Sequence, residues 1–270
     1  MPLLSREFTF RGIRSSVVEG GEGFPVLMFH GSGPGASTAG NWRRVLEPLS
    51  ARYHVHAMDL IGFGQSGRKL SPPYFDLELW QAQCQELLDQ VPGDEIGIIA
   101  HSLSAVLALR LAGRNPRVRK LLTTGTIGAP FQINEQSVKV WTFPDNREEL
   151  RKTAEILIYD KAVIDDAYIQ TREKILFEDQ SYRAYFESMF AGDKQRFADA
   201  AVLSAEDLSR VTCDVLMLHG REDVAFPPTQ TLSIVEHIPQ ADVMLIARCS
   251  HSIAMEYPEK LLAAARLLFG

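Results

Sequence analysis

Short, continuously apolar segments constrain the fold of this 270-residue chain more than any other feature. Each ends in a small-residue turn and is followed by a helical pattern. Continuous apolarity indicates strands covered on both faces, as in a parallel sheet between helices. The expected strands are 25–29, 54–58, 95–100, 120–124, 214–218 and 243–246, and the expected helices are 41–52, 76–90, 102–114, 229–237 and 257–268. This alternation predicts an α/β fold with a mostly parallel, doubly wound sheet.

Two segments depart from the alternation. Near the start, Phe8, Phe10 and Ile13 alternate with polar residues around Gly12, which predicts two short antiparallel strands. Residues 130–210 show no convincing strand and are rich in charges and helix formers. We expect them to form a helical cap over the carboxyl edge of the sheet, where open parallel sheets bind ligands. The chain then divides into a core, residues 1–129 and 211–270, and a cap insertion, residues 130–210.

Composition excludes several classes of partner. The formal net charge of −6 disfavours nucleic acid and anionic membrane surfaces, because both need basic patches. Cys84, Cys213 and Cys249 are far apart and form no Cys-X-X-Cys pair, so neither a disulfide framework nor a zinc site is expected. The first residues lack a signal-peptide pattern, and no apolar run approaches the roughly 18 residues that cross a bilayer. We therefore expect a cytoplasmic protein that acts on a small molecule.

Residues 100–104, Ala-His-Ser-Leu-Ser, join an expected strand to the next helix. A serine at such a junction is typical of a nucleophile elbow, usually Gly-X-Ser-X-Gly, whose sharp turn lifts the hydroxyl clear of the sheet. Here Ala100 and Ser104 stand at the glycine positions, and both are small enough for the crowded turn. Ser102 is therefore a candidate nucleophile; from these residues alone, a serine that only caps the helix is the alternative.

A serine nucleophile needs a base, and the base needs an orienting carboxylate. In this architecture the acid and then the histidine follow the serine, on loops after later strands. Asp223 follows the strand 214–218 and His251 follows the strand 243–246, so both positions fit.

Other histidines, and the acidic neighbour of Asp223, fit the roles of base and acid less well. Two histidines lie within an expected strand, one lies at a helix end, and one is expected to point off the wrong side of the elbow; they are His54, His56, His237 and His101. Glu222 is shifted by one residue from Asp223, which turns it away from the inner face of the loop.

The segment His-Gly-Ser-Gly-Pro-Gly at 30–35 follows the strand 25–29. Glycines let the backbone approach a substrate closely, and acyl transfer needs two amide donors for the developing oxyanion. We assign one donor to the amide of Leu103 and the other to Ser32 or Gly33. A phosphate-binding loop is the competing interpretation, but neither Gly-Lys-[Ser/Thr] nor Gly-X-Gly-X-X-Gly is present.

With these motifs the chain resembles the α/β-hydrolases, and among them the meta-cleavage product hydrolases. Those enzymes split a carbon–carbon bond in 2-hydroxy-6-oxo-dienoates during aromatic ring degradation. The resemblance extends over nearly the whole chain, through residues 23–35, 41–43, 59–66, 125–133, 159–166 and 219–223. It implies an α/β-hydrolase fold with an inserted helical cap, a serine-dependent hydrolase, and no metal or organic cofactor.

The resemblance also implies roles for particular residues. It identifies Ser102, Asp223 and His251 as a catalytic triad. Asn41 would help to hold the substrate near the oxyanion loop, and Arg172 would face the dienoate carboxylate, which suits a planar, bidentate cation. A solvated charge on a cap helix is the alternative for Arg172. Aromatic and sulfur side chains of the expected cap would form pocket walls, or simply pack within the cap; they are Trp141, Phe131, Phe143 and Met189. Family members often form dimers, so a homodimer is an open alternative to a monomer.

Two motifs depart from the family pattern. The family has Gly-Asn-Ser-X-Gly at the elbow, where His101 replaces the asparagine, and Gly-His-Trp around the base, where this chain has Ser-His-Ser at 250–252. Ser252 in place of a large aromatic predicts a wider and more polar pocket floor, and His101 would be able to donate a proton or bind a substrate oxygen. These changes keep a carboxylesterase or lactonase open as an alternative. A cyclase, a ligand receptor and a cofactor-free dioxygenase are more distant alternatives.

Overall fold

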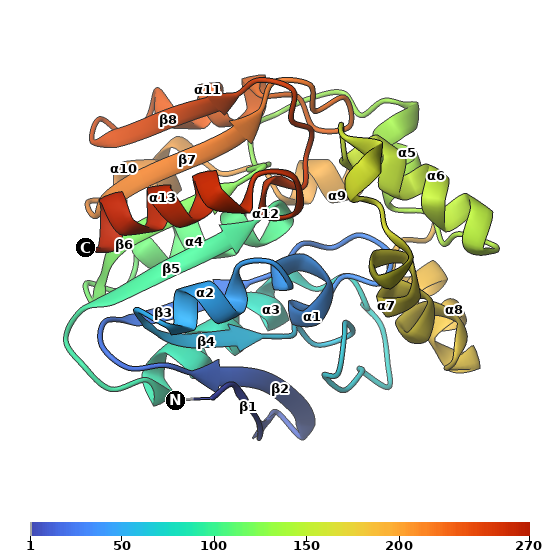
Figure 1. The fold of residues 1–270 in the computed structure, drawn as a ribbon, viewed down its shortest axis with the longest axis horizontal. Helices are drawn as coiled ribbons and strands as arrows, with labels where there is room; N and C mark the ends of the chain where they lie inside the picture. The colour runs from blue at the N-terminus through green and yellow to red at the C-terminus, as the bar shows by residue number, and fades with distance from the viewer. Residues whose placement is uncertain (1) are drawn as a thin grey trace.

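A single eight-stranded sheet runs through the molecule in the order β1-β2-β4-β3-β5-β6-β7-β8 (Figure 1). The structure is a computed structural model that describes residues 2–270. Its strands are β1 (Leu4–Phe10), β2 (Ile13–Gly20), β3 (Pro25–Phe29), β4 (His54–Met58), β5 (Ile96–His101), β6 (Val118–Thr124), β7 (Asp214–Gly220) and β8 (Ala241–Ile246). β2 pairs antiparallel with β1 and β4, and all the other pairs are parallel. The predicted α/β fold with a mostly parallel, doubly wound sheet is confirmed.

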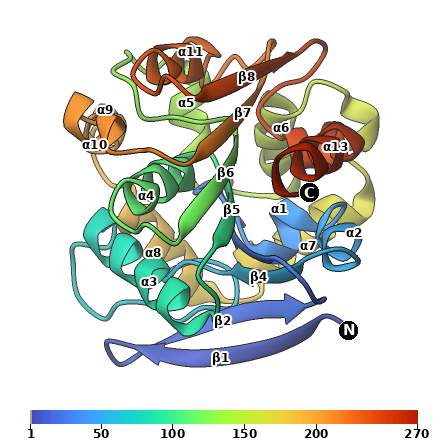
Figure 2. The same cartoon turned by 90° about the vertical axis from the view of Figure 1, so that its left-hand side faces the viewer.

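Helices cover both faces of this sheet. Helices α3 (Leu77–Gln90) and α4 (Leu103–Ala112) lie on one face, while α2 (Leu46–Ser50) and α13 (Pro258–Phe269) lie on the other (Figure 2). Alternate residues of β3 therefore enter different hydrophobic clusters. Leu27 and Phe29 belong to one cluster, and Val26 and Met28 belong to the other. A strand buried on both faces in this way explains why its sequence is continuously apolar.

The prediction of a single helix over residues 41–52 was wrong. The structure has two short helices there, α1 (Thr38–Trp42) and α2 (Leu46–Ser50). Pro48 explains the break, because it has no N–H to donate to the carbonyl of residue 44 and its ring would clash with that carbonyl. In α2 the proline stands in the first turn, where helices tolerate it.

The chain between β6 and β7 is helical. Its elements are α5 (Glu135–Val140), α6 (Arg147–Leu157), η1 (Lys161–Val163), α7 (Asp166–Phe177), α8 (Gln180–Met189), α9 (Gln195–Ala200) and α10 (Ala205–Ser209). Helices α5 to α8 lie beyond the carboxyl end of the sheet (Figure 1), and α10 packs against α4. Helix α7 contacts α1, so this insertion closes over the loops that follow β3.

The remaining helices follow the last strands. They are α11 (Thr229–Val235) and α12 (Ile253–Glu256), the latter leading into α13. No helix within residues 2–270 is long and apolar enough to cross a lipid bilayer.

Candidate active site

The turn between β5 and α4 places Ser102 in a strained conformation. Its φ of 57° and ψ of −124° lie in a region that residues with a side chain rarely adopt. Its amide donates to the carbonyl of Thr124 on the neighbouring strand, at 2.9 Å. A side chain at Gly31 would lie 3.2 Å from the Ser102 Cβ, so the loop after β3 presses against the same turn. These features lift the Ser102 hydroxyl away from the sheet, as a nucleophile elbow does.

Ser104, which stands where the elbow usually has glycine, is fully buried. Its hydroxyl donates to the carbonyl of His30, directly after β3. A serine is tolerated at this crowded position because its polar atom has a partner on the adjacent loop.

Ser102, His251 and Asp223 form a continuous chain of hydrogen bonds. The Ser102 Oγ lies 2.9 Å from His251 Nε2, and His251 Nδ1 lies 2.6 Å from Asp223 Oδ2. The other oxygen of Asp223 accepts from the amide of Phe226 at 2.9 Å. All three side chains are buried, although they come from loops after three different strands. The arrangement can pass a proton from the hydroxyl to the imidazole while the carboxylate fixes the imidazole tautomer.

A second histidine contacts the same carboxylate. His219 Nε2 lies 3.2 Å from Asp223 Oδ2, and its Nδ1 lies 2.7 Å from the hydroxyl of Thr231. Burial alone would raise the pKa of Asp223, but His251 and His219 outweigh it and hold that pKa below its usual value. Asp223 is therefore ionised at neutral pH.

His101 lies differently from the sequence expectation. Its ring lines the same cavity as Ser102 and lies 4.7 Å from the His251 ring, centroid to centroid. Its Nδ1 is 3.1 Å from the carbonyl and 3.0 Å from the hydroxyl of Thr124, the residue paired with it in the sheet register. These contacts hold the ring on the side of the nucleophile. Burial, and then the charge of His251, lower the pKa of His101, so it is neutral at neutral pH.

Two adjoining cavities open beside Ser102. The first is lined by Gly31, Ser32, Gly33, Ala36, Asn41, His101, Ser102, Val140, Leu157, Arg172, His251 and Ser252. The second shares four of these residues, Asn41, His101, Arg172 and Ser252, and adds Trp42, Ala254 and Met255. The structure therefore brings most of the residues singled out in the sequence to one place.

Leu103 and Trp141 do not line either cavity. Leu103 is the first residue of α4, a position where the amide has no acceptor within the helix and can donate elsewhere. Trp141 is buried, and its indole N–H donates to the Ser32 hydroxyl at 3.1 Å. Trp141 therefore contacts the glycine-rich loop without lining either cavity.

Arg172 is a buried cation at the edge of both cavities, with only 7% of its surface exposed. Its Nη1 donates to the carbonyl of Pro34 at 2.9 Å, and its guanidinium lies over the Tyr168 ring at 4.7 Å. Its Nε has no hydrogen-bond partner, and no carboxylate within residues 2–270 lies at ion-pair distance from it. Burying an unpaired charge is unfavourable, so this site favours an anionic ligand.

Sequence reasoning missed several residues at the site. A Cβ on Gly125, which follows β6, would lie 2.9 Å from His251 Nδ1, so only glycine leaves room for the imidazole. Gly31, Val140 and Leu157 line the cavity, and His219 holds Asp223. The position of Gly125 just after a strand was an available signal, because each triad residue also follows a strand.

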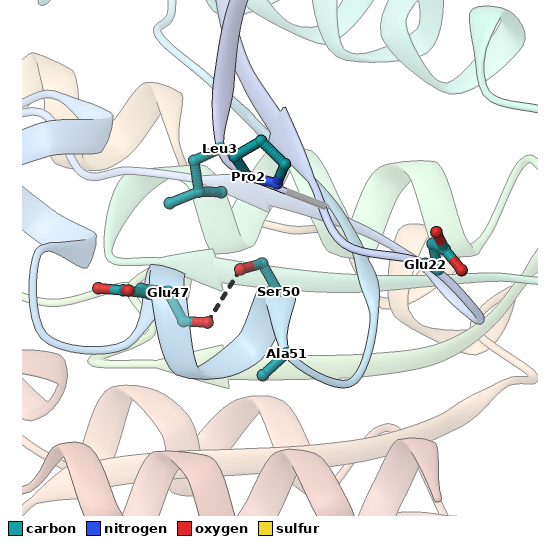
Figure 3. Close-up of a pocket in the computed structure, with 6 residues that line it drawn as sticks. All are labelled: Pro2, Leu3, Glu22, Glu47, Ser50 and Ala51. Atoms are coloured by element: carbon teal, nitrogen blue, oxygen red, sulfur yellow. Dashed lines mark hydrogen bonds between the residues drawn. The ribbon is translucent and has the colours of Figure 1, made fainter.

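Hollows elsewhere on the surface lack this chemistry. The hollow in Figure 3 is lined by Pro2, Leu3, Glu22, Glu47, Ser50 and Ala51. The hydroxyl of Ser50 donates to the backbone carbonyl of Glu47 at 2.9 Å, and the lining offers no imidazole base. The elbow site is therefore the candidate active site.

The whole chain is similar to known proteins. Residues 26–265 match a family model described as the alpha/beta hydrolase family. The chain is 30% identical to a 2-hydroxymuconate semialdehyde hydrolase of Pseudomonas sp. (strain CF600), over 95% of this chain and 90% of that protein. It is 31% identical to a 2-hydroxy-6-oxo-2,4-heptadienoate hydrolase of Pseudomonas putida, over 91% and 88%. A solved meta-cleavage product hydrolase from Pseudomonas fluorescens IP01 superposes with a TM-score of 0.91 at 28% identity, over 98% of this chain and 97% of that one.

Proposed function

This chain belongs to the alpha/beta hydrolase family, and we propose that it hydrolyses a carbon–carbon bond in a 2-hydroxy-6-oxo-dienoate. Ser102, His251 and Asp223 are its proposed catalytic triad. The observation that carries the substrate class is Arg172, a buried cation without a carboxylate partner in the described chain, on the same cavity as Ser102. A dienoate carries a carboxylate and a 6-oxo group, which matches a cavity lined by both a cation and a nucleophile.

The reaction starts with ketonisation of the bound dienol. The enol proton leaves the 2-hydroxyl and a proton is added at C5, with His251 placed to move it. This step converts C5 into a carbon that can leave with the electron pair of the C5–C6 bond, because the pair delocalises onto the new 2-oxo group.

His251 then acts as a general base. Its Nε2 takes the proton of Ser102, or of a water that Ser102 positions, as the oxygen attacks C6. Asp223 accepts from Nδ1 and stabilises the imidazolium that forms. The oxyanion on C6 is held by the amides of Leu103 and of Ser32 or Gly33.

Collapse of this intermediate breaks the C5–C6 bond. The electron pair moves to C5 and through the dienolate, which His251 reprotonates. The net reaction consumes one water and releases a 2-hydroxydienoate and a carboxylic acid. If Ser102 is acylated, the water enters in a second half-reaction with the same base.

An esterase or lactonase is the second candidate function. His101 and Ser252 both line the cavity, where the family pattern has an asparagine and a tryptophan, and we expect a more polar floor for that reason. Such a floor would also suit an ordinary ester or lactone. The homodimer and the cytoplasmic location stay predictions from the sequence.

Two substrates distinguish these functions. The purified protein should bleach a yellow ring-fission dienoate with a higher kcat/KM than it shows for p-nitrophenyl acetate, a neutral ester. Rapid turnover of the ester without bleaching of the dienoate would refute the proposed reaction and favour the esterase.

A further inference from the structure

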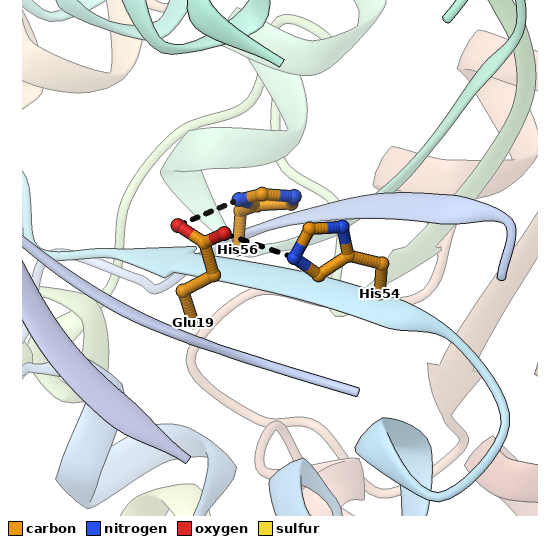
Figure 4. Close-up of side chains that lie close together, drawn as sticks. All are labelled: Glu19, His54 and His56. Atoms are coloured by element: carbon orange, nitrogen blue, oxygen red, sulfur yellow. Dashed lines mark hydrogen bonds and ion pairs between the residues drawn. The ribbon is translucent and has the colours of Figure 1, made fainter. Parts of the chain in front are cut away.

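A cluster of two histidines and one glutamate lies on the antiparallel part of the sheet (Figure 4). Glu19 is on β2 and faces His56 directly across the β2–β4 register, while His54 lies two residues earlier on β4. Side chains two residues apart project from the same face of a strand, so all three meet on one face. His54 begins β4, whereas the proposed active site lies beyond the carboxyl ends of the parallel strands, so the cluster is separate from it.

The potential ligand atoms of the three side chains lie close together. His54 Nε2 lies 2.9 Å from Glu19 Oε1, and His56 Nδ1 lies 3.4 Å from Glu19 Oε2. One potential ligand atom from each residue lies within 4.8 Å of the others. In a tetrahedral zinc site with metal–ligand bonds of about 2.0–2.1 Å, the ligand atoms are about 3.3 Å apart.

His56 supplies a second, independent observation. It is only 2% exposed, and within residues 2–270 its ring nitrogens make no hydrogen bond of good geometry; Nδ1 has only the ion-pair contact with Glu19 Oε2 at 3.4 Å, and Nε2 has no polar contact. Buried polar nitrogens in native proteins nearly always have a partner. A metal ion bound at Nδ1 would provide one.

The cluster is also partly open to solvent. The side chains of His54 and Glu19 are 25% and 28% exposed, so an ion can enter from solvent. Arg6 Nε donates to Glu19 Oε2 at 2.5 Å and occupies one carboxylate oxygen. The other oxygen, Oε1, faces His54 across the gap in which a metal would replace a shared proton.

We propose that Glu19, His54 and His56 form a binding site for a divalent transition-metal ion of the zinc, nickel and copper type. Two imidazoles and one carboxylate are the ligand set that such ions prefer, whereas Mg²⁺ and Ca²⁺ prefer oxygen ligands only. The ion would tie β2 to β4 and stabilise this side of the sheet without taking part in the proposed hydrolysis.

Calorimetric titration of the tag-free, chelator-washed protein with ZnCl₂ tests the proposal. The expected result is one saturable site per chain and a rise in Tm with added Zn²⁺. His54→Gln and His56→Gln should each weaken binding by about tenfold or more, because each removes a ligand. The partly exposed His54 gives a usable variant even if His56→Gln does not fold.

Two further variants make the test specific. His237→Gln removes an exposed histidine beyond α11 and should leave Zn²⁺ binding unchanged. Arg6→Gln frees the second oxygen of Glu19 and should tighten binding. Absence of saturable Zn²⁺ binding, or binding that survives both His54→Gln and His56→Gln, would overturn the proposal.

Discussion

Replacing Asp223 with asparagine should lower kcat by about 10⁴ while the chain stays folded. Asparagine has nearly the same shape and can still accept from the amide of Phe226. Its NH₂ group, however, cannot accept from His251 Nδ1, which lies 2.6 Å from the present carboxylate oxygen. The imidazole then carries its proton on Nε2, the atom that has to accept from Ser102 at 2.9 Å.

The magnitude follows from this change of tautomer. In serine triads the same substitution costs about 10⁴ in kcat, equivalent to about 5.4 kcal/mol of transition-state stabilisation. Loss of the carboxylate charge, which is buried and would otherwise stabilise the imidazolium, acts in the same direction.

Glu222 provides the matched control. It neighbours Asp223 in sequence, but its Oε2 accepts from the amide of Cys249 at 3.1 Å rather than from His251. Glu222→Gln should therefore keep activity within about twofold of the parent. Initial rates of dienoate bleaching measure both variants, and circular dichroism with chemical denaturation checks that both are folded. An Asp223→Asn protein that keeps a tenth of the parent activity, or a Glu222→Gln protein that loses as much, would refute the assignment.

Other substitutions probe separate parts of the site. Arg172→Gln should raise the KM for the dienoate by about tenfold or more and leave the KM for neutral esters unchanged, because it removes a charge-assisted hydrogen bond to the carboxylate. Arg183 is exposed, so Arg183→Gln should change neither KM. Gly125→Ala should lower kcat for every substrate, since its Cβ would lie 2.9 Å from His251 Nδ1, and equal rates for glycine and alanine would contradict the packing. The pKa of buried His101 is lowered in the folded chain. Below a pH of about 6.5, His101 therefore binds a proton in the unfolded chain but not in the folded chain, and the free energy of unfolding falls as the pH drops. His101→Asn should therefore reduce the slope of the unfolding free energy against pH by up to about 1.4 kcal/mol per pH unit between pH 6.5 and 5. Denaturant titration at several pH values measures this slope, and an unchanged slope would contradict a neutral, buried His101 ring.

The positions of the strands along the chain and the residues of the proposed triad were accessible to sequence reasoning because they depend on local signals. A parallel sheet buried on both faces requires continuously apolar strands, and its catalytic loops follow those strands at their carboxyl ends. Ser102, Asp223 and His251 each follow such a strand, and the structure brings them within hydrogen-bond distance of one another. The break at Pro48 is also readable from the sequence.

What the sequence could not provide depends on contacts between distant segments. The direction of the His101 ring is set by Thr124, and the second partner of Asp223, His219, is fixed by its own contact with Thr231. Trp141 lies behind Ser32 because the insertion packs against the glycine-rich loop. These pairings depend on how the layers pack, which no local pattern encodes.

His54 and His56 illustrate the same limit. In the sequence they are simply two histidines within a strand. Their relation to Glu19 depends on the β2–β4 register, which places Glu19 opposite His56. Only that pairing makes them a candidate ligand set.

Product analysis of the parent protein and of Ser102→Ala shows whether the chain cleaves the carbon–carbon bond and whether Ser102 is needed for it. A 2-hydroxy-6-oxo-dienoate is mixed with each protein, its absorbance is followed, and the products are identified by mass spectrometry. We expect the parent to release a 2-hydroxydienoate and a carboxylic acid in equal amounts. We expect Ser102→Ala to bind the dienoate but to form neither product at a comparable rate. Release of both products by Ser102→Ala at the parent rate, or an intact dienoate after incubation with the parent, would contradict the proposed mechanism.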